Sequence, residues 1–173
     1  MRSRFYKGTL NDLEREIVAN VDKHGCHINA VFDPDGNDPS FAYSVGFTKT
    51  LAKLNKVDVP EVIAFGLPDE VYGPAFNTLL AMCAADLDLV EGERIPGFFG
   101  DYDCIVRAVH GSWIEDAYLA SAIWYHRTQM NRELTNVVML TWPDADHLFP
   151  WEDGCADWVR SVQPPLYEPR LNS

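Results

Sequence analysis

The chain has 173 residues, of which 47% are hydrophobic and 12% aromatic, a composition typical of a globular protein rather than a disordered one. A chain of this length fits one domain, so we expect a single domain over residues 1–173. The 14 basic and 26 acidic side chains give a net charge of −12. This charge argues against nucleic acid and anionic membrane surfaces as partners, because both attract cationic proteins.

The cysteines predict a reduced, cytoplasmic protein. Cys26, Cys83, Cys104 and Cys155 lie far apart without a C-x-x-C pair, which is typical of small buried hydrophobic side chains. The sequence shows no signal peptide and no apolar run of about 18 residues. We therefore expect a cytoplasmic location and no membrane partner.

Residues 10–23 are predicted to form an amphipathic helix. Asn11 and Glu14 fit a capping box at its start, and Gly25 fits its end. Apolar side chains recur at helical spacing, at Leu10, Leu13, Ile17 and Val21.

A strand over residues 26–32 and a turn at 33–36 lead into segment 41–47, whose two strand faces differ in size. Glycine weakens a strand and usually marks the close approach of another backbone or of a ligand. The sequence therefore predicts a pocket over the smaller face. The larger face carries Phe41, Tyr43, Val45 and Phe47, and the smaller face carries Ala42, Ser44 and Gly46.

The remaining segments complete an α+β pattern. The apolar run 62–65 predicts a central buried strand, and residues 86–102 read as a long loop or weak strands. We predict a mixed sheet of about five or more strands packed by about three helices. The strands are expected near residues 26, 41, 62, 104 and 136, and the helices near residues 12, 70 and 115.

Ser44 invites comparison with a catalytic serine. Segment 42–46 resembles a relaxed nucleophile elbow, and Asp144 and His147 follow in the required order. However, Ala42 replaces the first glycine of that motif, and the alternation places Ser44 within a strand rather than at its tip. We therefore favour a structural role for Ser44, as a small residue that allows a neighbouring segment to pack closely against its strand. We assign no catalytic residue and no cofactor.

Two clusters carry residue types that bind metals, His24-Cys26-His27 and Asp33-x-Asp35-x-Asn37. The first has no matching second pair, which a closed zinc site needs. The second has Asp38 at the sixth position, where a calcium loop needs glycine. We therefore predict no metal site and read the second cluster as an acidic turn.

Segment 142–151 combines two carboxylates, a histidine and three aromatic side chains directly after a predicted strand. Such loops often hold ligand sites, although the same aromatic residues would also serve to fasten the tail to the body. One cleft would form if the strand ending at Trp142 ran parallel to the strand ending at Phe47, and antiparallel strands would separate the two loops. The candidate ligand-binding residues are Tyr43, Ser44, Gly46, Trp142, Asp144 and His147.

The order of four short segments resembles a bacterial family known as domain of unknown function 4262. The segments are Phe41-Ala42-Tyr43-Ser44-Val45-Gly46, the run from Pro60 to Pro68, Trp142-Pro143-Asp144 and Phe149-Pro150-Trp151. The resemblance covers about residues 25–151, which leaves 152–173 as an ordered C-terminal tail. It implies no activity, cofactor or catalytic residue.

The same resemblance bears on two segments. Members of the family often carry threonine where this chain has Ser44, which disfavours a nucleophile but keeps a hydroxyl group. The stretch 48–57 departs from the family pattern and is expected to be a variable edge loop.

Two functions stay open. The first is a small-molecule-binding domain, catalytic or not, with a polar-aromatic cleft between Ser44 and the 142–151 loop. The second is a non-catalytic interaction or regulatory domain whose acidic surface meets a basic partner protein.

Overall fold

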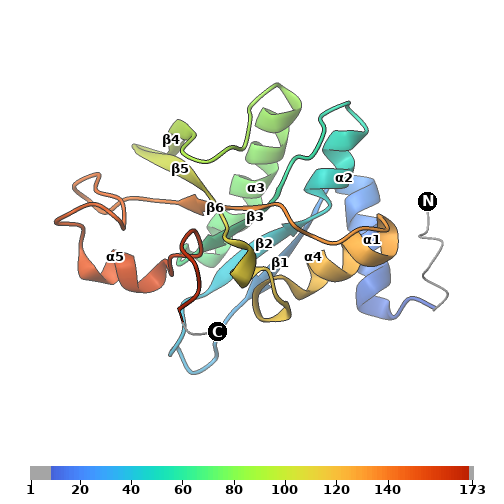
Figure 1. Cartoon of the computed structure of the whole chain (residues 1–173), viewed down its shortest axis with the longest axis horizontal. Helices are drawn as coiled ribbons and strands as arrows, with labels where there is room; N and C mark the ends of the chain where they lie inside the picture. The colour runs from blue at the N-terminus through green and yellow to red at the C-terminus, as the bar shows by residue number, and fades with distance from the viewer. Residues whose placement is uncertain (1–8, 172–173) are drawn as a thin grey trace.

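The computed structural model describes residues 9–171, which form one mixed sheet covered by helices (Figure 1). In chain order the elements are α1 (Asp12–His24), β1 (His27–Val31), β2 (Phe41–Val45), α2 (Phe47–Ala52), β3 (Glu61–Phe65), α3 (Asp69–Ala84), β4 (Arg94–Phe99), β5 (Tyr102–Ala108), the 3-10 turn Gly111–Trp113, α4 (Asp116–Gln129), β6 (Val137–Thr141) and α5 (Asp157–Val162). The sheet has the order β1-β2-β3-β6-β5-β4. Its strands are antiparallel except for the parallel pair β3 and β6.

The predicted α+β class is confirmed, and β3 is buried on both faces as its apolar run indicated. Helices α1 and α4 cover the face of the sheet that carries Tyr43, Val45 and Ile63. Helices α2 and α3 cover the opposite face, which carries Ala42 and Val62. The larger and smaller faces of β2 thus point to different helical layers, and both are packed.

Helix α1 has the capping box that the sequence predicted. The Asn11 side chain accepts a hydrogen bond from Glu14 N at 2.8 Å, and the Glu14 side chain accepts one from Asn11 N at 2.9 Å. Gly25 ends the helix with φ +89° and donates its N–H to Val21 O at 2.9 Å. These contacts satisfy backbone groups that a helix otherwise leaves open at its ends.

The chain between β2 and β3 differs from the prediction. Strand β2 ends at Val45, Gly46 takes φ +98°, and α2 begins at Phe47 in a stretch that the sequence predicted as strand and then loop. The sequence alternation extended the strand to Phe47 and the family pattern made 48–57 an edge loop, but Phe47 and Leu51 lie one helical turn apart and are both fully buried. A positive φ at Gly46 turns the chain into this short helix.

The C-terminal tail folds back onto the sheet. The guanidinium of Arg107 on β5 lies 4.3 Å from the ring centre of Trp151 and 4.0 Å from that of Tyr167. Arg107 also donates to Glu91 at 2.7 Å. The fastening role that the sequence offered for the aromatic residues of segment 142–151 therefore holds for Trp151, which packs with Tyr167 of the tail around Arg107.

The cysteines are free and buried, as expected for small core residues. Burial raises the pKa of Cys26 and of Cys83 to about 11, and the pKa of Cys104 to about 12. Burial also raises the pKa of Cys155. Thiols with such pKa values stay protonated and unreactive near neutral pH.

Candidate functional site

The predicted site residues lie at two opposite ends of the sheet. Strand β2 is antiparallel to β3, which is parallel to β6, so the chain leaves β2 and β6 in opposite directions. Continuing the register places Ser44 opposite Val62, whose partner on β6 is Val138. Trp142 lies four residues further along, roughly 13 Å in the strand direction. The two groups therefore do not form one cleft, and Figure 1 shows α2 and α5, which follow them, on opposite sides of the molecule.

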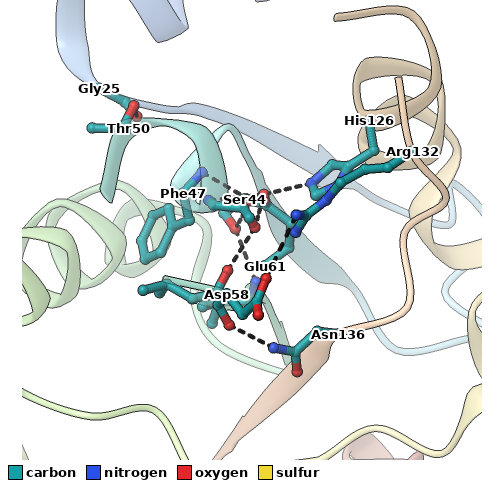
Figure 2. Close-up of polar contacts among 12 residues, drawn as sticks. Gly25, Ser44, Phe47, Thr50, Asp58, Glu61, His126, Arg132 and Asn136 are labelled. Carbon is teal, nitrogen blue, oxygen red and sulfur yellow. Dashed lines mark hydrogen bonds and ion pairs between the residues drawn. The ribbon is translucent and has the colours of Figure 1, made fainter. Parts of the chain in front are cut away.

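The first group surrounds Glu61, a fully buried carboxylate at the start of β3 (Figure 2). One carboxylate oxygen accepts from Ser44 Oγ at 2.9 Å and from Phe47 N at 3.0 Å. The other accepts from Thr48 N at 3.2 Å and lies 2.9 Å from Thr48 Oγ1. The Thr48 hydroxyl also lies 2.6 Å from Val59 O, so its single proton is shared between two acceptors.

His126 of α4 completes this arrangement, which we call the Glu61 cluster: Ser44, Thr48, Glu61 and His126. His126 Nε2 lies 2.9 Å from the second oxygen of Glu61, and both side chains are buried. Hydrogen-bond donors from Ser44, Phe47 and Thr48 therefore surround both oxygens of Glu61. His126 Nδ1 is buried and has no hydrogen-bond partner within residues 9–171.

Neither Glu61 nor His126 was among the residues that the sequence singled out. Glu61 directly precedes the apolar run of β3. A charged residue at the first position of a buried strand needs buried hydrogen-bond partners, and this feature of the sequence could have identified Glu61. His126 lies 65 residues away on α4, so only the tertiary structure joins the two.

The Glu61 cluster contains serine, glutamate and histidine in an order that does not activate the serine. In a catalytic triad the histidine lies between the nucleophile and the acid, whereas here Glu61 lies between Ser44 and His126. The Ser44 hydroxyl donates to Glu61 and accepts from Val62 N at 2.9 Å, and Ser44 is fully buried. The cluster therefore joins β2, α2, β3 and α4 and offers no nucleophile to a substrate.

Tyr43 and Gly46 also have structural partners. The Tyr43 hydroxyl accepts from Ser121 N at 3.0 Å and from the side chain of Asn29 at 2.7 Å, which links α4 and β1 to β2. A side chain at Gly46 would meet Val21 of α1 at 2.6 Å. Tyr43 therefore ties α4 and β1 to β2, and the absence of a side chain at Gly46 lets α1 lie close to the end of β2.

The second group lies in the loop after β6, which Asp144 organises. One oxygen of Asp144 accepts from Asp146 N and Leu148 N, both at 2.9 Å, and the other accepts from Ala156 N at 2.8 Å. These backbone donors, those of Leu148 and Ala156 first, hold the pKa of Asp144 below its usual value. His147 is exposed, with its ring centre 4.9 Å from that of Tyr102.

A cavity of about 260 Å³ opens beside this loop, beyond the carboxyl ends of β3 and β6. Ligands commonly bind at this edge of a sheet with parallel strands. We call this cavity the aromatic pocket. Its lining includes Phe99, Tyr102, Trp142, Trp158, Leu67 and Asp144.

Two residues of the aromatic pocket also line a second cavity. Leu67 and Phe99 border a space of about 480 Å³ that runs along α3 past Glu70 and Thr78. The two cavities are therefore neighbours at one end of the sheet.

A wider groove of about 750 Å³ lies at the other end of α3, between the end of α1 and α2. His24 and Cys26 line it, but His27 instead pairs its Nδ1 with Asn20 at 3.0 Å. Across residues 9–171, no group of three or more histidine, cysteine or acidic side chains is arranged to hold a metal ion. Asp33 accepts hydrogen bonds from the backbone of three following residues, as an acidic turn does.

A family model described as a domain of unknown function (DUF4262) matches residues 20–156. No curated protein and no solved structure matches the chain. In the described part of the chain, none of the helices has the length and hydrophobicity that crossing a membrane requires.

Proposed function

We propose that this chain, which belongs to the DUF4262 family, is a small-molecule-binding domain and that the aromatic pocket is its binding site. The observation that supports the proposal is the convergence of four aromatic side chains from separate segments on one cavity at the carboxyl edge of a parallel strand pair. Small-molecule sites are mostly apolar cavities with a few placed polar groups. The aromatic pocket fits that description, with Asp144 and Tyr102 as its polar members.

Hydrogen bonds hold Trp142, one wall of the aromatic pocket, in place before any ligand enters. Trp142 donates its indole N–H to Phe65 O at 2.8 Å. Its backbone N–H donates to the Gln163 side chain at 3.0 Å, and Gln163 donates back to Trp142 O at 2.8 Å. The Trp158 ring lies 5.8 Å from that of Trp142. A rigid site loses little conformational entropy on binding, which favours affinity.

The geometry supports binding rather than chemistry. Asp144, the carboxylate of the aromatic pocket, already accepts three backbone hydrogen bonds and keeps a lowered pKa, so it is a poor general base. Ser44, the residue with a resemblance to a nucleophile, is buried at the other end of the sheet.

Filling the aromatic pocket should weaken binding strongly. Ala145 is exposed and lines the pocket, so Ala145→Phe is expected to weaken the binding of small aromatic fragments, such as indole, at least tenfold without unfolding the protein. Chemical-shift titration of the full chain measures the affinity and locates the fragment. Ala120→Phe, an exposed substitution on α4, is the matched control and should bind as the parent does. Fragments that bind both variants equally, or that shift no resonance of the pocket, would refute the proposal.

A second candidate function, the interaction domain, is favoured by a different surface. Asp58, Asp86 and Asp88 line a polar concavity of about 450 Å³, and the neighbouring Val57 and Val90 are exposed. Lys56 of the same lining pairs with Asp86, and Arg132 pairs with Asp58 at 3.5 Å, so Asp88 adds the excess negative charge. Acidic groups around exposed apolar side chains suit a basic peptide with apolar residues. A peptide of alternating lysine and leucine should bind the parent and lose affinity for the double variant Asp86→Asn, Asp88→Asn. Equal affinity for both proteins would rule this surface out.

A further inference from the structure

We infer that the ligand of the aromatic pocket carries a quaternary or methylated ammonium group, a step that rests on the proposed binding function. The inference combines the side chains that line the pocket, the charge they carry and the hydrogen-bonding capacity they leave open. The first two point to a cation, and the third points to a cation that needs no hydrogen-bond acceptor.

Four aromatic side chains line the aromatic pocket. They are Phe99 at the end of β4, Tyr102 at the start of β5, Trp142 after β6 and Trp158 on α5. Aromatic ring faces carry partial negative charge and attract cations, tryptophan most strongly. Several rings around one cavity are the usual means by which proteins bind methylated ammonium groups.

The charge of the lining has the matching sign. Asp144 is the charged side chain that lines the aromatic pocket, and its lowered pKa keeps it ionised. In the neighbouring cavity the charged side chain is Glu70. Within the described residues, no lysine or arginine lines either space, and the chain as a whole carries a charge of −12. An anionic ligand would therefore be repelled, and a cationic one attracted.

The hydrogen bonds of Asp144 decide which kind of cation fits. Three backbone N–H groups already occupy its oxygens, so the carboxylate contributes charge but little further capacity as an acceptor. A primary ammonium has three N–H donors, and burying them without acceptors is costly. A trimethylammonium group has no N–H donor and presents methyl groups to the rings. The aromatic pocket therefore favours a methylated cation over a primary amine.

The size of the two cavities suggests how such a ligand would lie. The aromatic pocket, at about 260 Å³, suits a compact head group. The remainder of the ligand would pass Leu67 and Phe99 into the neighbouring cavity, where Glu70 and Thr78 offer polar contacts. Choline, with a trimethylammonium head and a short polar arm, is a suitable probe of this arrangement.

The test compares choline with 3,3-dimethylbutan-1-ol, a neutral alcohol of the same shape, by calorimetry on the full chain at constant ionic strength. We expect choline to bind at least tenfold more tightly than the alcohol, and ethanolamine to bind more weakly than choline. Equal binding of choline and the alcohol overturns the cation inference but leaves the proposed function intact. Failure of both probes overturns the inference, and if no aromatic fragment binds the pocket either, the proposed function fails with it.

Variants at Trp158 separate the ring from the bulk of the side chain. Trp158 is 62% exposed, so its replacement should not disturb folding. Trp158→Leu is expected to weaken choline binding at least tenfold, whereas Trp158→Phe should keep most of it, because phenylalanine retains an aromatic face. Phe32→Leu, at an exposed aromatic residue outside the pocket, is the matched control. Equal affinity of the two Trp158 variants would show that the ring face does not bind the cation.

Discussion

Glu61→Ala is expected to unfold a large share of the protein at room temperature or to lower its Tm by at least about 10 °C, since 1 kcal/mol corresponds to about 2–4 °C in a chain of this size. The substitution removes the acceptor for Ser44, Phe47, Thr48 and His126 at once. Each buried donor left without an acceptor costs about 1–3 kcal/mol, so the total reaches about 5 kcal/mol. Thermal denaturation followed by circular dichroism measures the change.

The variant Glu61→Gln tests the carboxylate itself. Glutamine keeps the shape and one acceptor oxygen, but its amide N–H₂ would face donors at the other position. We therefore expect Glu61→Gln to have a Tm between that of the parent and that of Glu61→Ala. Glu133→Ala is the control, because Glu133 pairs with Arg127 at the surface and should leave the Tm close to that of the parent. A Glu61→Ala protein that melted with the parent would show that the Glu61 cluster does not hold the fold.

Gly46→Val is expected to lower the free energy of unfolding by about 3 kcal/mol or more, through two separate costs. The first is backbone strain, because φ at Gly46 is +98° and a left-handed conformation costs a residue with a Cβ about 1–2 kcal/mol. The second is overlap, because a Cβ would lie 2.6 and 2.7 Å from the two methyl groups of Val21. Forcing atoms into a packed core typically costs about 1–3 kcal/mol.

Gly36→Val separates these two costs. Gly36 also has a positive φ, +70°, but within residues 9–171 no heavy atom beyond its two chain neighbours lies within 4 Å of the position of its Cβ. Gly36→Val should therefore carry the backbone strain alone. We expect its free energy of unfolding, measured by urea denaturation, to fall by about 1–2 kcal/mol. Similar losses for both glycines would contradict the close approach of α1 to Gly46.

The sequence was most informative where the cause of structure is local. The capping box of Asn11 and Glu14 and the apolar run of β3 depend on residues that are close in the chain, and both are confirmed. The family resemblance is confirmed as well. Short helix α2 was missed, because six residues give too little periodicity to outweigh the β-branched threonines within them.

Long-range arrangement was the part that the sequence did not reveal. The prediction of one cleft required the strands that end near Phe47 and Trp142 to run in parallel, and strand direction depends on pairing between distant segments. The contact between Glu61 and His126 could not be predicted either, because it also joins distant segments of the chain. Within the candidate site, Trp142 and Asp144 do line a cavity, whereas the aromatic partners Phe99 and Tyr102 come from a segment that was read as a loop or weak strands.

The distance between the Glu61 cluster and the aromatic pocket has a consequence for how this fold can diversify. The buried carboxylate that ties β2, α2, β3 and α4 together lies at one end of the sheet, and the cavity lies at the other. Mutations far apart without shared partners add nearly independently. Substitutions around Ala145 and Trp158 can therefore accumulate while the anchoring residues stay unchanged. Laboratory evolution toward new ligands should succeed by randomising the pocket end alone, with the melting temperature of the selected variants close to that of the parent.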